Sequence, residues 1–184
     1  MPVLLEQTSA RLKSEKKGTE MGALKLGLVA VVLVVLGFAA YVRLAPSDPA
    51  RWHDDPVAGQ RPKDWGGTPE PLGQGAVMLT QLGSARSFSQ HTLAPADLLA
   101  RLDAIALGTP RTTRLAGSAQ SGRITWVTRS ALWGFPDYIT ATATEAPEGS
   151  ELLIFARLRF GEGDLGVNAA RLRQWLVSLS NTNG

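Results

Sequence analysis

The 184-residue sequence contains no cysteine and only two histidines, His53 and His91. The absence of cysteine excludes disulfides, a thiolate nucleophile, and cysteine-ligated zinc or iron–sulfur centres. Two histidines are too few for a three-histidine metal site, and we expect no metal and no other cofactor. His53 with Asp54 and Asp55 is the best start of a metal site, but no further ligand at a suitable spacing completes it.

Neither sign of charge dominates, since the chain has 19 Lys and Arg residues and 16 Asp and Glu residues. Hydrophobic residues make up 44% of the chain and charged residues 19%, a composition that suits a globular core. The arginines are spread along the sequence and balanced by acids, so we expect no nucleic-acid partner. At this length one ordinary domain of roughly 100–150 residues fits, and two do not.

One long hydrophobic run stands out, the 17 uncharged residues 26–42 between Lys25 and Arg43. This length is the lower limit for a membrane-spanning helix, and the flanking cations lengthen it because their side chains reach toward the interface. Residues 29–36 are apolar on every side, which a helix at the surface of a soluble domain would not be. We predict a tail over residues 1–24 and a transmembrane helix over residues 25–44.

The charges before this run predict its orientation. Five basic residues precede it, namely Arg11, Lys13, Lys16, Lys17 and Lys25. Counting such residues in short flanking segments places the N-terminus in the cytoplasm. We therefore expect a bacterial inner-membrane protein with a periplasmic C-terminal domain. A cleaved signal peptide ending before Ala40 is the alternative, although the apolar run exceeds the roughly 7–15 residues usual for such a segment.

Residues 45–75 are rich in proline, which predicts an irregular extracytoplasmic neck. Trp52 and Trp65 are unusual in a merely flexible linker and indicate that the neck lies along a surface, either its own domain or a partner. Trp52 follows the hydrophobic run closely enough to be an anchor at the lipid headgroups instead. Both tryptophans are our candidates for partner or interface contacts.

Residues 76–184 are predicted to form the globular domain. Strands are expected over residues 76–82, 123–130 and 138–144, and a further strand over 151–160 forms a hairpin with the last of these. Helices are expected over residues 95–108 and from Asp164 onward, where apolar residues recur at intervals of three and four residues. Since parallel βαβ alternation is missing, we predict an α+β fold with an antiparallel sheet and helices on one face.

Two motifs, residues 130–138 (SALWGFPDY) and 161–175 (GEGDLGVNAARLRQW), resemble those of a family known only as domain of unknown function 1499. The resemblance extends over about residues 76–180. Ala156 and Leu158 stand where the family usually has serines, so any role of those hydroxyls is missing here. The resemblance implies a fold and an envelope location, and it implies no established activity. The matching positions are Phe135, Pro136, Asp137, Gly161, Asp164, Gly166, Asn168 and Arg171.

Asp164, Asn168 and Arg171 fall on one face of the last helix near its N-terminus, where the helix dipole attracts anions. With Arg157 and Arg159 from the preceding strand, they are candidates for binding a carboxylate or a phosphate. The structural alternative is an N-cap by Asp164 and a hydrogen bond from Arg171 back to the loop. The sequence favours the structural interpretation, because a capped helix start already accounts for an aspartate and two glycines.

Asp137 is the remaining candidate. It is predicted either as a buried carboxylate paired with Arg157 or Arg129, or as an ordinary turn residue after Pro136. The turn interpretation is preferred.

Three functions follow as hypotheses. The first is a non-catalytic accessory or assembly subunit of a larger inner-membrane complex, respiratory or photosynthetic, that also contacts lipid. The second is a periplasmic module that binds a small ligand or lipid in a cavity under the last helix. The third is an envelope enzyme, which only the cluster of acidic residues and arginines supports. We expect no catalytic residues.

Overall fold

The computed structural model describes residues 2–54, 68–73, 76–81, 84–161 and 163–181. The chain divides into two compact units, Met1–Leu44 and Ala45–Gly184. The first unit is one helix, α1 (Pro2–Leu44), so the segment that we expected to be a separate tail continues the same helix. Its stretch Glu20–Leu44 is long and apolar enough to cross a membrane, and side chains such as Leu28 and Leu33 are exposed there.

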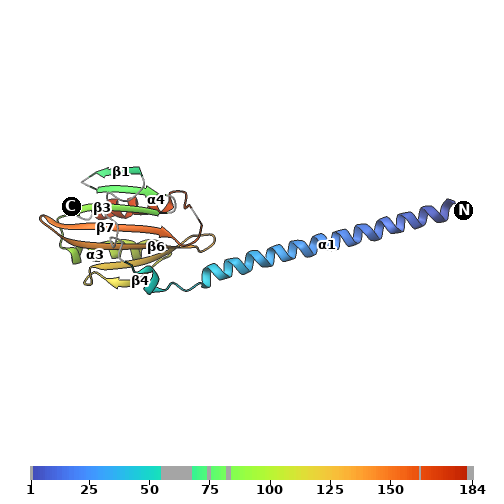
Figure 1. Cartoon of the computed structure of the whole chain (residues 1–184), viewed down its shortest axis with the longest axis horizontal. Helices are drawn as coiled ribbons and strands as arrows, with labels where there is room; N and C mark the ends of the chain where they lie inside the picture. The colour runs from blue at the N-terminus through green and yellow to red at the C-terminus, as the bar shows by residue number, and fades with distance from the viewer. Residues whose placement is uncertain (1, 55–67, 74–75, 82–83, 162, 182–184) are drawn as a thin grey trace. The chain divides into compact units, whose positions relative to one another are not determined.

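The second unit is built on a seven-stranded antiparallel sheet with the order β1-β2-β3-β7-β6-β5-β4 (Figure 1). All neighbouring strands pair antiparallel. Consecutive strands are neighbours except where the chain leaves β3 and re-enters the sheet at the opposite edge as β4. The strands are β1 (Thr68–Gly73), β2 (Ala76–Gln81), β3 (Ser84–His91), β4 (Thr112–Ser118), β5 (Arg123–Arg129), β6 (Pro136–Ala146) and β7 (Gly149–Leu158).

Two helices, α3 (Pro95–Gly108) and α4 (Val167–Asn181), cover one face of this sheet. In Figure 1 they lie behind it, α4 near β3 and α3 near β6 and β4. The rings of Trp126 on β5 and Trp175 on α4 meet edge to face at 5.6 Å in the core. Leu98, Leu102 and Leu172 fill the space around them and are fully buried. The predicted α+β fold with helices on one face is confirmed.

The sequence pattern did not predict three of the strands, namely β1, β3 and β4. On β3 the inward side chains are Ala85, Ser87 and Ser89, all buried, and small residues there lack the β-branched and aromatic pattern that indicates a strand. On β4 the pairing with β5 shifts at a bulge between Arg114 and Ala116, which interrupts the alternation.

The proline-rich neck also contains more regular structure than expected. Pro69 and Pro71 lie in β1, which is an edge strand and therefore has one row of backbone groups outside the ladder. A short helix, α2 (Pro49–Trp52), begins after Asp48, whose carboxylate accepts a hydrogen bond from the Ala50 N–H at 2.9 Å. Pro49 lacks a backbone N–H, which costs nothing in the first turn because N–H groups there have no acceptor within the helix. The expectation of a wholly irregular neck was wrong at these two places.

Candidate functional site

Of the six residues that we considered for an anion-binding or structural cluster, four come together where β6 begins and α4 begins. Arg171 on α4 donates from Nη2 to Oδ2 of Asp137 at 3.2 Å and from Nη1 to Oδ1 of Asn168 at 2.6 Å. The Asp164 carboxylate accepts from the backbone N–H groups of Gly166 at 3.0 Å and Asn168 at 2.8 Å. We call Asp137, Asp164, Asn168 and Arg171 the helix-start cluster.

The bonds of Asp164 satisfy backbone donors at the start of α4. These are the donors that an external anion would need, and a carboxylate of the chain already occupies them. The side chains of the cluster contribute two carboxylates and one guanidinium, so the local charge does not favour a further anion. The geometry agrees with the structural interpretation at Asp164, whereas the bonds of Arg171 go to Asp137 and Asn168. Asp137 lies in β6 and pairs with Arg171, so its interpretation as a turn residue was wrong.

Residues 161–166 have the spacing G-x-G-x-x-G directly before α4, so our expectation that no such loop opens a helix was wrong for the spacing. In dinucleotide-binding proteins this loop joins a parallel strand to a helix, and its N–H groups receive a pyrophosphate. Here the preceding strand, β7, pairs antiparallel on both sides, and Asp164 takes the N–H groups. The spacing alone does not indicate a nucleotide site.

Burial raises the pKa of the Asp137 carboxyl, and the nearby charge of Asp164 acts in the same direction. Arg171 opposes both effects through its charge and its hydrogen bond. Because the pKa in the folded state is raised, protonation of Asp137 favours folding, and this stabilisation is lost as pH rises through the folded pKa. The amide nitrogen of Asn168, fully buried beside this pair, has no hydrogen-bond partner among the described residues.

Arg157 does not belong to the helix-start cluster. It lies opposite Tyr138 in the β6–β7 ladder, whereas Asp137 lies opposite Leu158, and successive residues of a strand point to opposite faces. The guanidinium of Arg157 instead donates to the backbone carbonyl of Trp52 at 2.9 Å. Arg159 behaves in the same way and donates to the carbonyl of Pro46 at 2.9 Å. The expectation that both arginines join Asp164 was wrong, because it ignored the alternation of faces along β7.

The outer face of the sheet, the one opposite α3 and α4, holds residues 45–54. Trp52 stacks on Tyr138 of β6 with ring centroids 3.8 Å apart and ring planes 8° from parallel. The Tyr138 hydroxyl hydrogen-bonds Ser47 Oγ at 2.8 Å. His53 Nδ1 hydrogen-bonds the hydroxyl of Thr125 on β5 at 2.9 Å. We call residues 45–54 the fastened segment.

One position of the sheet beside this segment, Gly117, has no room for a side chain. At Gly117 on β4, with φ +83°, a Cβ atom would lie 2.8 Å from Cε1 of His53. Burial and the charge of Arg123 together lower the pKa of His53, which favours the neutral imidazole. Nδ1 of a neutral imidazole can donate to or accept from the Thr125 hydroxyl, depending on the tautomer. The Thr125 hydroxyl also hydrogen-bonds the Thr140 hydroxyl at 2.9 Å.

Trp52 has only 9% of its surface exposed, because it packs on Tyr138 of its own domain. The alternative that the neck lies along its own domain holds for residues 45–54. Trp65 lies outside the described residues, as does Asp55. Sequence reasoning missed Tyr138, Ser47 and Thr125 as partners of the segment. Arg157 on β7 and Arg159 just after it alternate with apolar residues, which indicated a polar outer face.

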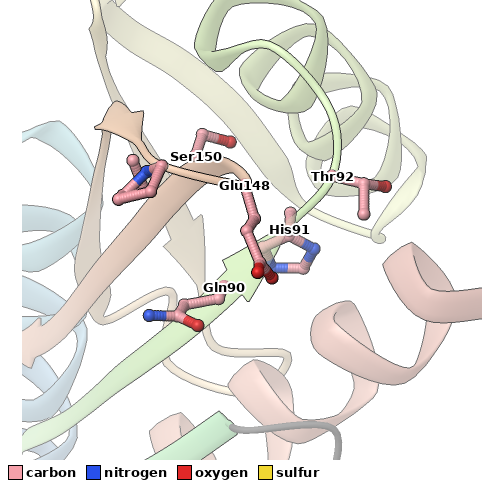
Figure 2. A pocket seen from close by; sticks show the side chains of 7 residues that line it. Gln90, His91, Thr92, Glu148 and Ser150 are labelled. Carbon is pink, nitrogen blue, oxygen red and sulfur yellow. The ribbon is translucent and has the colours of Figure 1, made fainter.

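A separate pocket of about 390 Å³ opens at the other end of the sheet, where β3 ends and the β6–β7 hairpin turns (Figure 2). His91 and Glu148 both line it, and the Glu148 side chain extends to the side of the pocket where the His91 ring lies. His91 Nε2 hydrogen-bonds Ser89 Oγ at 2.8 Å, and burial lowers the pKa of the imidazole. At Gly149, with φ +133°, a Cβ atom would lie 2.2 Å from the His91 carbonyl oxygen, so this turn requires glycine.

A family model described as "Protein of unknown function (DUF1499)" matches residues 76–179, more than half of the chain. The chain belongs to the DUF1499 family. The DUF1499 match begins at β2, so it includes the helix-start cluster and the pocket but not the fastened segment.

Solved structures also match the chain. One is the X-ray crystal structure of protein MLL2253 from Mesorhizobium loti, which is 12% identical, with 55% of this chain and 98% of that chain covered, at a TM-score of 0.43. No curated protein matches the sequence.

Proposed function

We propose that this DUF1499 protein is a non-catalytic, membrane-tethered periplasmic protein that serves as an accessory or assembly subunit of a larger inner-membrane complex. In this proposal α1 is the anchor, with its N-terminus in the cytoplasm. The domain then faces a neighbouring membrane protein from the periplasmic side. A respiratory or photosynthetic complex is the class of partner that we favour.

The observation that carries the proposal is the fastened segment. Residues 45–54 follow directly after the apolar stretch that ends at Leu44. Strands β5, β6 and β7 hold them, through the hydrogen bond between His53 and Thr125, the Trp52–Tyr138 stack and the hydrogen bond from Arg157 to the Trp52 carbonyl. A domain on a free linker samples many positions, whereas a fastened linker restricts the domain to a short reach from the membrane. Such restriction favours docking on a fixed neighbour over the capture of diffusing substrates.

Copurification tests the proposal. The tagged full-length chain is purified from its native membranes in a mild detergent, and the proteins that elute with it are identified by mass spectrometry. We expect one set of integral membrane proteins in constant ratio, and we expect the Trp52→Ala variant to lose them while remaining in the membrane. Val177→Ala, which changes an exposed residue far along α4, is the matched control. Elution of the wild-type chain alone would contradict the proposal.

The orientation has its own test. A periplasm-dependent reporter fused after Gly184 should be active, because the basic residues precede the span. A reporter active only in the cytoplasm would contradict the proposed topology, and recovery of a soluble chain beginning near Ala40 would support the cleaved-signal alternative.

The pocket supports a second candidate, a module that binds a small ligand. Its volume falls in the range of small-ligand pockets, and polar residues from two elements line it. This pocket is not the one that we expected, since fully buried side chains of Leu172 and Trp175 fill the space beneath α4. Native mass spectrometry of the extracted protein should show a bound small molecule that is lost in His91→Gln and Glu148→Gln if this candidate is correct.

A further inference from the structure

Four large apolar side chains are exposed on two loops at the end of the domain opposite the pocket. Leu132 and Trp133, in the loop before β6, are 74% and 38% exposed. Leu165 and Val167, at the start of α4, are 102% and 51% exposed. We call these four residues the apolar rim. The two loops are neighbours, because the rings of Phe135 and Phe160 at their bases are 5.8 Å apart.

Both loops are ordered by hydrogen bonds, so the rim is not a set of loose side chains. In the first loop, the backbone N–H of Ser130 donates to the Phe135 carbonyl at 2.9 Å, and the N–H of Phe135 donates to Ser130 Oγ at 3.0 Å. In the second, Asp164 holds the backbone on both sides of Leu165. Leu165 has φ +53°, a conformation that glycine or asparagine adopts more easily. Its fully exposed side chain makes no packing contribution that would offset this cost.

The covalent tether enters the domain at this same end. Arg159 follows β7 directly, next to Phe160 of the rim loop, and it donates to the carbonyl of Pro46 at 2.9 Å. Pro46 is two residues beyond Leu44, where the apolar stretch of α1 ends. Two extended residues span at most about 7 Å. The domain is therefore fastened at this end within about 7 Å of chain from the apolar stretch.

Cationic side chains accompany the rim. Arg111 is exposed and donates to the carbonyl of Arg129, immediately before the first loop, at 3.1 Å. Arg159 donates to neutral oxygens, the carbonyl of Pro46 and the hydroxyl of Tyr138. Such bonds leave a positive charge at the base of the rim. The helix-start cluster adds one net negative charge, since Asp137 and Asp164 stand against Arg171, and the two guanidinium groups of Arg111 and Arg159 exceed it. Apolar tips with cations behind them are typical of protein surfaces that enter an anionic lipid interface.

We propose that the apolar rim inserts into the interfacial layer of an anionic phospholipid bilayer, beside the point where the chain leaves the membrane. The bilayer then holds the domain at two places, the span and the rim, and fixes which face points along the membrane. This contact requires no partner protein and goes beyond the proposed accessory role. Tryptophan at position 133 suits the headgroup region because its ring is apolar and its N–H is polar.

The absence of native cysteine allows a direct test. Single cysteines are introduced as Leu132→Cys and Leu165→Cys in the rim and as Val177→Cys on α4, which is 58% exposed but distant from the rim along its helix. Each full-length variant is labelled with a nitroxide and reconstituted in vesicles of phosphatidylcholine and phosphatidylglycerol. Electron spin relaxation by dissolved oxygen and by an aqueous nickel chelate then reports the depth of each label.

We expect the two rim labels to collide several-fold more with oxygen, relative to the nickel chelate, than the Val177→Cys label does. Vesicles of phosphatidylcholine alone should give a shallower rim position, and equal depth in both lipids would overturn the role of the arginines. Equal exposure of all three labels to the nickel chelate would overturn the insertion itself. A rim label that is water-exposed in vesicles and immobilised only in native membranes would also overturn it, since the rim would then contact protein. Far-UV circular dichroism confirms that each variant is folded.

Discussion

The inner face of the sheet packs apolar side chains against α3 and α4, whereas the outer face packs Tyr138, threonines and arginines against the fastened segment. On the inner face, burial of area stabilises the fold without strict direction. On the outer face, one aromatic stack, two hydrogen bonds to backbone oxygens and two between side chains select one short stretch of chain. The comparison indicates that the inner face supplies most of the buried apolar core, whereas the outer face determines which stretch of chain packs on it.

Removal of a core tryptophan should have the largest effect. Trp175→Ala removes the contact with Trp126 and the hydrogen bond to Thr109, which is 2.8 Å long. We expect a loss of about 3–5 kcal/mol in the free energy of unfolding, because a large cavity forms between sheet and helix. Urea unfolding of the full-length chain in detergent micelles, followed by circular dichroism, measures it. A loss smaller than that of Trp52→Ala would reverse our ranking of the two faces.

Trp52→Ala should release the fastened segment and leave the core folded. The expected loss is about 1–3 kcal/mol, since one stacked ring is removed from a site that is buried on one side only. Hydrogen exchange should become faster at the backbone amides of residues 47–54 and stay unchanged in β5 and β6. Trp133→Ala, at a more exposed tryptophan, is the control and should leave the exchange of the segment unaltered. Faster exchange throughout the domain would show that the two faces are not independent.

At the start of α4, Asp164→Ala should cost about 0.5–2 kcal/mol through the loss of bonds to two backbone N–H groups. Asp164→Asn retains an acceptor oxygen and should cost less. Urea unfolding of both variants measures the difference. If stability were unchanged and the affinity for inorganic phosphate changed instead, the helix-start cluster would be a binding site and not a cap.

The smallest effect is expected from pH. Burial and Arg123 lower the pKa of His53 in the folded state, so below its ordinary value of 6.5 the unfolded chain binds the proton first. The free energy of unfolding should therefore fall as pH drops from about 7.5 to 5.5. His53→Gln should flatten part of this slope, and His91→Gln another part, because the pKa of His91 is lowered as well. Urea midpoints across this range test it, and a slope unchanged in both variants would contradict it.

Local sequence patterns determined a large part of this protein. The apolar run of α1, the alternation in β6 and β7, and the period of three and four in α3 and α4 each arise from residues close together in the chain. The same is true of Asp164, whose capping bonds reach residues two and four positions away. Such features are predictable because near neighbours alone decide them.

Only the tertiary structure decided the rest. The hydrogen bond between Ser47 and Tyr138 joins residues 91 positions apart, and the one from Arg159 to Pro46 spans 113 positions. Whether Arg157 faces α4 or the fastened segment depends on the register of β7, and a shift of one residue would exchange its two faces. Packing of the whole sheet against its helices determines the register of β7 and the face on which Arg157 lies. The residues near Arg157 in the sequence therefore do not predict either.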